Sequence, residues 1–197
     1  MQHSICPSCK TEKDISQQRG LLAVEKLWYL HRLKIDPNPK SPAHPQPDGM
    51  RRLAAQNTQW FWACDHCLAE GRALPSDPTK HNIAMGTSYA AYIDRPFTCE
   101  TCQCPSVFSA AEQQYWYETL GFLIWVYPKH CRSCRKQKRA YTKLQKDLMK
   151  ALQNLDHNNQ EQLQHIAALY AEMGLESKSS LYMRRAQNAE KKAKGNK

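Results

Sequence analysis

The chain has 197 residues, of which 41% are hydrophobic, and this is enough for one or two small domains with a packed core. Its longest apolar run, Phe122–Tyr127, is far shorter than the roughly 18 residues of a membrane span, and its first residues do not resemble a secretory signal. We therefore expect a cytoplasmic or nucleoid protein with no membrane partner. The formal net charge is +10, which favours an acidic partner.

The N-terminal third begins with a Cys-x-x-Cys pair, Cys6 and Cys9. A helix is predicted over residues 15–35, because Leu21, Val24, Leu27, Trp28 and Leu30 form an apolar stripe at helical spacing. Residues 36–49 contain five prolines and predict an exposed, extended loop. A second pair, Cys64 and Cys67, follows the loop.

The middle of the chain has the clearest helix signal. After a third pair, Cys99 and Cys102, the residues Ser109 and Glu112 form a capping box that predicts a helix start, and Gly121 predicts its end. The apolar run 122–127 then predicts a buried strand leading to a fourth pair, Cys131 and Cys134. Three further helices are expected over residues 136–155, 160–173 and 179–193, the last two as a hairpin.

The cysteine spacing predicts metal binding. Eight of the nine cysteines fall into Cys-x-x-Cys pairs, and tetrahedral Zn²⁺ prefers four soft ligands. A thioredoxin-like redox pair or a disulfide framework is the alternative, but four pairs without a signal sequence argue against both. We therefore predict two zinc ions per chain, with the ligands Cys6, Cys9, Cys64, Cys67, Cys99, Cys102, Cys131 and Cys134.

The pairs can be matched in three ways. Neighbouring pairs give sites from Cys6/Cys9 with Cys64/Cys67 and from Cys99/Cys102 with Cys131/Cys134. An interleaved match stays open, because the loop between Cys9 and Cys64 is long and rich in proline. Cys104 is left over and is expected to be a spectator thiol, with a substitute ligand or a redox handle as alternatives.

The residues around the last two pairs resemble a known family. Phe97-Thr-Cys99-Glu-Thr-Cys102, Phe108-Ser109, Glu112-Gln113, Tyr117, Gly121-Phe122 and Pro128-Lys-His-Cys131-Arg-Ser-Cys134-Arg135 are similar to the "probable zinc-ribbon domain" family of small microbial proteins. The resemblance covers about residues 95–139 and implies zinc binding and a ribbon fold. Gln103 departs from the family pattern, which usually has glycine there, so a left-handed turn at Gln103 would be mildly strained.

The expected fold is small α+β: zinc-ribbon or zinc-knuckle modules with inserted helices, followed by an α-helical C-terminal extension. We expect an N-terminal zinc module over residues 1–94, with its helix and proline-rich loop. A zinc-ribbon domain should cover residues 95–139, and a helical extension with a basic tail residues 140–197.

The excess positive charge is concentrated in one part of the chain. Residues 1–128 balance 12 basic against 12 acidic side chains, whereas residues 129–150 contain nine basic and one acidic. Neutralising the zinc-bound thiolates explains Arg132 and Arg135 at most, because the other cations extend over several helical turns. This pattern predicts nucleic-acid binding, to RNA, the ribosome or DNA, through Arg132, Arg135, Lys136, Lys138, Arg139, Lys143 and Lys146.

The alternative function is a zinc-stabilised adaptor for a protein partner. An enzyme is not expected, because the sequence has no P-loop, GxSxG, HExxH or paired carboxylates, and no histidine placed as in an HNH nuclease. We also expect no small-molecule substrate. A redox sensor that releases zinc on thiol oxidation is a further alternative.

Overall fold

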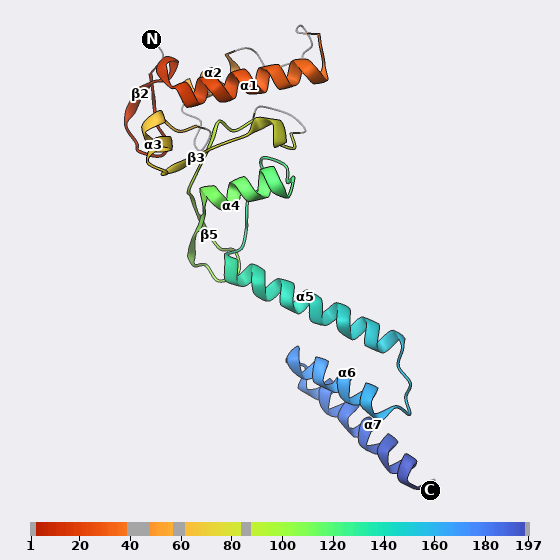
Figure 1. Ribbon diagram of the computed structural model, residues 1–197. Coiled ribbons are helices and arrows are strands. Elements are labelled where there is room, and N and C mark those ends of the chain that lie inside the picture. The colour runs from red at the N-terminus through yellow and green to blue at the C-terminus, as the bar shows by residue number, and fades with distance from the viewer. Residues whose placement is uncertain (1–2, 39–47, 57–61, 84–87, 196–197) are drawn as a thin grey trace. The chain divides into compact units, whose positions relative to one another are not determined.

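The computed structural model describes residues 3–38, 48–56, 62–83 and 88–195 (Figure 1). The chain divides into two compact units, residues 1–131 and 132–197. The described strands form three two-stranded antiparallel sheets, so the fold is the predicted α+β class. Within the described residues, every helix is too short or too polar to cross a membrane.

The first unit opens with a short hairpin and a long helix. Strand β1 (His3–Ile5) pairs with β2 (Glu12–Asp14), and the 3₁₀ turn η1 (Ile15–Gln17) leads to α1 (Arg19–Ile35). The predicted helix therefore begins one turn later than expected, because the Asp14 carboxylate accepts the Ser16 N–H at 3.0 Å and caps a 3₁₀ turn. Leu21, Val24 and Trp28 are buried as predicted, whereas Leu27 and Leu30 are exposed.

Helix α2 (Gly49–Ala55) was not predicted from the sequence, and it packs against α1. Its link to α1 is the buried carboxylate of Glu25, which accepts from Arg51 Nε at 2.6 Å and from the Arg51 backbone N–H at 3.1 Å. A buried acid requires such a partner. Residues 39–47 of the predicted proline-rich loop lie outside the described residues.

This unit contains two hydrophobic cores, and the first of them includes three of the cysteines. Helix α3 (Asp65–Ala69) is followed by β3 (Ala73–Pro75), the 3₁₀ turn η2 (Pro78–Lys80) and β4 (Ala91–Ile93), which pairs with β3. The first core combines aromatic and aliphatic side chains of α1, α2 and the segment before α3, and it includes Leu21, Trp28, Met50, Ala54, Trp62 and three of the cysteines.

The second core is formed by residues from β4 to Ile124. Strand β5 (Arg95–Thr98) pairs with β6 (Pro105–Phe108), and α4 (Ala110–Gln114) continues as the π-helical turn η3 (Tyr115–Thr119). The predicted cap at Ser109 is confirmed, since Ser109 Oγ accepts the Glu112 N–H at 3.2 Å at the start of the helix. Gly121 has φ +67°, which is the left-handed conformation expected where this helix ends. The buried members of this core are Tyr92, Phe108, Ala110, Tyr117 and Ile124.

The strand predicted over residues 122–127 is wrong. Within this run only Leu123 makes a β-bridge, to Asn82, and most of its side chains are exposed. The backbone is instead fixed by single hydrogen bonds, from Tyr117 Oη to the Val126 carbonyl at 2.6 Å and from the Phe122 N–H to the Trp116 carbonyl at 3.0 Å. The apolar run therefore forms an ordered surface loop.

The second unit consists of α5 (Arg132–Gln153), α6 (Gln160–Glu172) and α7 (Glu176–Gly195). Helix α6 packs against both α5 and α7, and α6 and α7 form the predicted hairpin. Leu148 of α5 meets Ile166, Leu169 and Tyr170 of α6, while Leu163 of α6 meets Ala186 and Ala189 of α7. The expected boundary at residues 139/140 falls inside α5, which runs without a break.

Candidate metal centres

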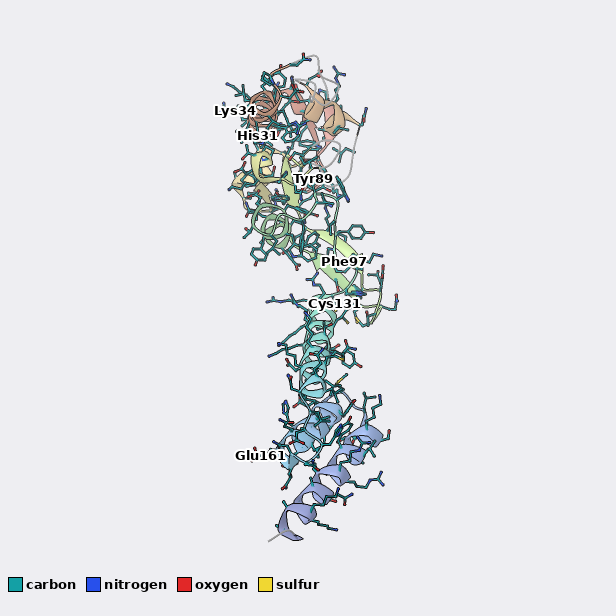
Figure 2. The ribbon with its side chains drawn as sticks, turned by 90° about the vertical axis from the view of Figure 1, so that its right-hand side faces the viewer. His31, Lys34, Tyr89, Phe97, Cys131 and Glu161 are labelled. Carbon is teal, nitrogen blue, oxygen red and sulfur yellow. The ribbon has the colours of Figure 1, made fainter. Side chains whose placement is uncertain are left out.

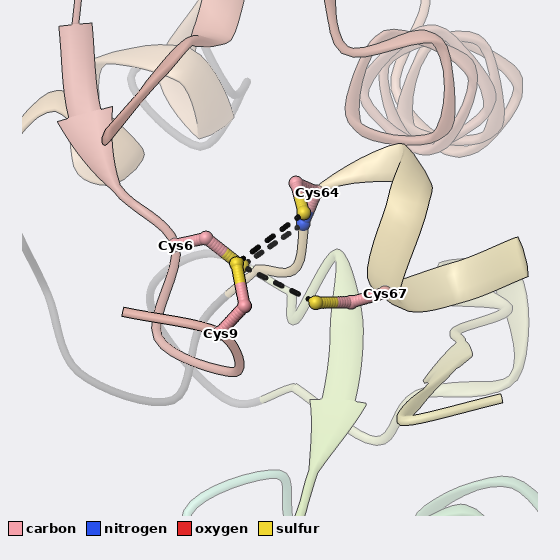
Figure 3. A group of neighbouring side chains, drawn as sticks. All are labelled: Cys6, Cys9, Cys64 and Cys67. Atoms are coloured by element: carbon pink, nitrogen blue, oxygen red, sulfur yellow. Dashed lines mark hydrogen bonds between the residues drawn. The ribbon is translucent and has the colours of Figure 1, made fainter. Parts of the chain in front are cut away.

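The first cysteine group brings together residues more than 50 positions apart. Cys6 and Cys9 lie in the turn that joins β1 to β2, Cys64 is the N-cap of α3, and Cys67 is in the first turn of that helix (Figure 3). The Sγ atoms of Cys6 and Cys67 are 3.9 Å apart, and those of Cys9 and Cys64 are 3.8 Å apart. The neighbouring match of pairs is therefore the one that the fold makes.

These distances fit a zinc ion. In a tetrahedron with Zn–S bonds of about 2.3 Å, the sulfurs are about 3.8 Å from one another. All nine cysteines are free thiols, and the four sulfurs of this group lie within 4.8 Å of one another. Zinc held by these four thiolates would link the hairpin to α3 and leave no coordination position for water.

The N-terminal ends of α1 and α3 cap each other, which positions the second half of this site. The Asp65 carboxylate accepts the backbone N–H groups of Arg19 at 2.7 Å and Gly20 at 2.8 Å. In return, Gln18 Oε1 accepts the Asp65 N–H at 3.0 Å. A Cβ atom on Gly20 would lie 2.6 Å from Cδ1 of Leu68, so a larger residue there would require the Leu68 side chain to move.

The second cysteine group has the same construction. Cys99 and Cys102 lie in the turn between β5 and β6, and Cys134 is in the first turn of α5. Cys131, which Figure 2 labels, directly precedes that helix. The Sγ atoms of Cys102 and Cys131 are 3.8 Å apart, again the edge of a zinc–sulfur tetrahedron. A second contact holds the turn in place, because the Glu100 N–H donates to the Lys129 carbonyl at 2.9 Å.

Equivalent hydrogen bonds occur in the two cysteine groups. The Cys64 N–H donates to Cys6 Sγ at 3.3 Å, and the Cys131 N–H donates to Cys99 Sγ at 3.2 Å. In each turn the residue after the second cysteine is left-handed, with φ +61° at Lys10 and +56° at Gln103. Gln103, where the family usually has glycine, thus does adopt the left-handed conformation. The chain contains two copies of one zinc-binding design.

Cys104 has a backbone role in this design. Its carbonyl accepts the Cys99 N–H at 3.1 Å, as the Thr11 carbonyl accepts the Cys6 N–H at 2.9 Å in the first group. The Cys104 thiol is exposed and lies outside the group of four sulfurs. Cys104 therefore occupies the position of Thr11, which requires no thiol.

The local environment prepares some of these thiols for ionisation. Backbone N–H groups of Cys102 and Cys131 lower the pKa of Cys99 to about 5. At Cys9 burial opposes ionisation, but hydrogen bonding with the Thr11 hydroxyl at 2.9 Å lowers the pKa to about 6. Burial raises the pKa of Cys64 to about 12, so this sulfur loses its proton at neutral pH only when a cation takes its place.

Two Cys₄ sites, each built from a hairpin turn and the start of a helix, define a zinc-binding protein of the zinc-finger class. A family model described as a probable treble clef domain matches residues 93–143, about a quarter of the chain. No curated protein matches the chain, and no solved structure does. The family match confirms that the segment resembling a known family is a zinc-finger-like domain. The match is not specifically to a zinc ribbon, and Cys131 and Cys134 lie at the start of α5 and not on a second hairpin.

All of the cations predicted to bind nucleic acid lie on α5: Arg132, Arg135, Lys136, Lys138, Arg139, Lys143 and Lys146. The sequence reasoning missed Asp65 and Gln18, which hold the first site together. An aspartate directly after the third cysteine was the only signal, and its partners are 45 residues or more away in the chain.

Proposed function

We propose that the protein is a non-enzymatic, cytoplasmic nucleic-acid-binding protein, in which two structural zinc sites hold the fold and α5 contacts phosphates. One observation carries this proposal: most cations of α5 share one face of the helix, and all of them except the half-buried Arg135 are exposed. Arg135, Lys138, Arg139, Lys143 and Lys146 follow a spacing of three and four residues, which places them on one side of the helix. They line the same surface hollow, together with Thr142.

This basic face is turned away from the neighbouring helix. Leu144, Leu148 and Ala151 pack towards α6, and at 100° per residue they lie on the opposite side of α5 from Arg139 and Lys146. Residues 136–143 are all exposed. Among the described residues, no acidic side chain forms an ion pair with Lys136, Lys138, Arg139, Lys143 or Lys146.

The energetics favour a polyanion as the partner of this face. Like charges on adjacent turns of a helix repel one another by a few tenths of a kcal/mol per pair. The repulsion is relieved when a phosphate backbone lies along the face, and counterion release adds to the affinity. Each Cys₄ site has four protein ligands and no open position, which supports a structural use of the metal.

Salt-dependent binding tests this function. The logarithm of the affinity for RNA or DNA should fall with the logarithm of salt by about 0.9 per phosphate contact on duplex DNA and about 0.7 on single strands. Lys138→Glu with Arg139→Glu should remove about two contacts and flatten the slope accordingly. The control is Lys26→Glu with Lys34→Glu on α1, which changes the net charge equally and should leave the slope unchanged.

The adaptor function is the competing proposal. If the unmodified protein shows no salt-dependent binding to RNA or DNA, the nucleic-acid function is wrong and a protein partner must account for the basic face. Capture of partners from a lysate with and without nuclease then distinguishes the two, because a nuclease treatment removes only those partners that are held through nucleic acid.

A further inference from the structure

The loop from Leu120 to Tyr127 exposes a row of large apolar side chains. Phe122, Trp125 and Tyr127 keep 42%, 46% and 61% of their surface in contact with solvent, and Leu120 and Val126 are exposed beside them. Single apolar residues on a surface are ordinary, but five large ones exposed within eight residues of one loop indicate an interaction site.

The backbone beneath this row is ordered. Ile124 is buried, its N–H donates to the Asn82 carbonyl at 3.2 Å, and Asn82 Nδ2 donates to the Gly121 carbonyl at 3.0 Å. Together with the bond from Tyr117 to Val126, these contacts hold the loop from both ends. Aromatic side chains on a fixed backbone lose little conformational entropy when they bind a ligand.

Tyr127 of the row also lines a hollow, whose other lining residues are mostly aromatic residues and prolines. It has a volume of about 240 Å³ and is lined by Arg95, Pro96, Phe97, Phe108, Tyr127 and Pro128. Phe97 is on β5 (Figure 2), and Phe108 closes the hollow from the buried side. The hollow is smaller than the roughly 300–1,000 Å³ of pockets for drug-sized ligands, so its size suits one flat ring.

One cationic side chain lines the hollow. Arg95 has its guanidinium 4.6 Å from the centre of the Tyr89 ring, and among the described residues no acidic side chain contributes to the lining. Lys129, two residues after Tyr127, makes only an exposed ion pair with Glu100 at 3.7 Å, and a phosphate can replace such a weak partner. An aromatic hollow with cationic neighbours fits a nucleobase attached to a phosphate better than an apolar peptide.

The hollow and the basic face are close in the sequence. Tyr127 and Arg135, the first cation of that face, are eight residues apart, so their Cα atoms are separated by at most about 29 Å, whatever the path between them. A nucleic-acid strand spans that distance in a few nucleotides.

We propose that the hollow takes an unpaired base that stacks on Tyr127, so that the nucleic acid bound by α5 is single-stranded. This inference rests on the proposed function and narrows its substrate class. A base in a duplex is stacked on both sides and paired at its edge, and it does not enter the hollow without leaving the helix. Stacking on an aromatic ring tolerates any base, and a broad sequence range is therefore expected.

The test compares a labelled single strand of about 12 nucleotides with the duplex of the same sequence, by fluorescence anisotropy at several salt concentrations. Tyr127→Ala should weaken binding of the single strand about 10-fold and leave both the duplex affinity and the salt slope unchanged. Tyr127→Phe keeps the ring and should restore single-strand binding. Tyr115→Ala removes an equally exposed tyrosine outside the hollow and should have no effect.

The possible results distinguish failure of the single-strand inference from failure of the proposed nucleic-acid binding by α5. Equal binding of the single strand by the protein and by Tyr127→Ala, with the salt dependence intact, overturns the inference and leaves the proposed function standing. Loss of salt-dependent binding in the unmodified protein overturns both. If Tyr127→Ala instead abolishes a nuclease-resistant protein complex and does not change single-strand binding, the row is a protein-docking surface and the inference is wrong. Zinc content and melting temperature confirm that each variant is folded.

Discussion

The carboxylate of Asp65, the residue after the ligand Cys64, accepts the backbone N–H of Gly20 in the first turn of α1 at 2.8 Å. This contact links α1 to α3, because Asp65 caps α1 and itself lies in the first turn of α3. The position of Cys64 and Cys67 relative to the first core therefore depends on a residue that is not a ligand.

Removing this cap should weaken the first metal site without removing a ligand. Asp65→Ala loses two hydrogen bonds to backbone N–H groups, and we expect the free energy of unfolding to fall by about 1–2 kcal/mol. One zinc ion should become more accessible to a chelator, measured with a colorimetric zinc indicator. Asp48→Ala removes an exposed ion pair with Arg52 and should cost under about 1 kcal/mol. Equal effects of the two substitutions would contradict the role of Asp65.

The zinc content tests the two sites directly. Protein purified under reducing conditions should contain two zinc ions per chain by elemental analysis. Cys99→Ser or Cys131→Ser should lose one ion and unfold the hairpin of β5 and β6, because formation of the site and local folding are one event. Cys104→Ser should keep both ions, and the loss of one would make Cys104 a ligand.

The left-handed residue Gln103 predicts a stabilising substitution. A non-glycine residue at φ +56° is strained by about 1–2 kcal/mol, and glycine is not. Gln103→Gly should raise the free energy of unfolding by about 0.5–1 kcal/mol, less than the full strain because the exposed bond from Gln103 Nε2 to the Glu100 carbonyl is lost. Gln137→Gly, on an exposed position of α5, should lower it by about 1 kcal/mol. Chemical denaturation of zinc-loaded protein measures both, and the same sign for both would refute the prediction.

A buried histidine predicts how stability depends on pH. The His81 side chain is fully buried between the hydroxyl groups of Ser88 and Tyr92, and burial lowers its pKa to about 4. Tyr92 Oη donates to Glu118 Oε1 at 3.0 Å, so it accepts from the His81 Nε2–H. Because burial lowers its pKa, the ring is neutral at pH 7. In the unfolded chain the pKa is about 6.5, so the unfolded state binds more protons between these values.

Stability should therefore fall as the pH drops from about 6.5 through about 4, by up to roughly 3 kcal/mol from His81 alone. His81→Gln should be less stable near pH 7, and the difference between it and the unmodified protein should narrow as the pH falls. Zinc loss in acid affects both proteins, and comparing them at each pH removes that contribution. A difference that stays constant from pH 7 to pH 4.5 would show that His81 does not titrate as argued.

Local patterns were enough to predict the ligands, the capped helix at Ser109 and the cations of α5. Each depends on residues a few positions apart, and their spacing encodes turn or helix geometry directly. The left-handed conformation of Gln103 was suggested by the family resemblance, in which glycine usually follows the second cysteine, and not by the spacing of residues.

The contacts that join distant segments could not be predicted in this way. Asp65 and Gln18 meet across 47 residues, and no local pattern reports such a pairing. The run from Phe122 to Tyr127 was expected to be a buried strand because all of its residues are apolar. That prediction failed because an apolar run does not reveal whether a partner strand exists. Tyr117 and Asn82 take its hydrogen bonds instead, and its side chains stay on the surface.

The two copies of the zinc-binding design differ in how far solvent reaches their sulfurs. Cys6, Cys64 and Cys67 are buried, whereas Cys102 of the second site is exposed. A chelator therefore reaches the second site first, and metal exchange should proceed in two phases, with the ion at the start of α5 leaving before the other. In cells with little free zinc, this order would release the end of α5 that bears the basic face while the N-terminal module stays folded.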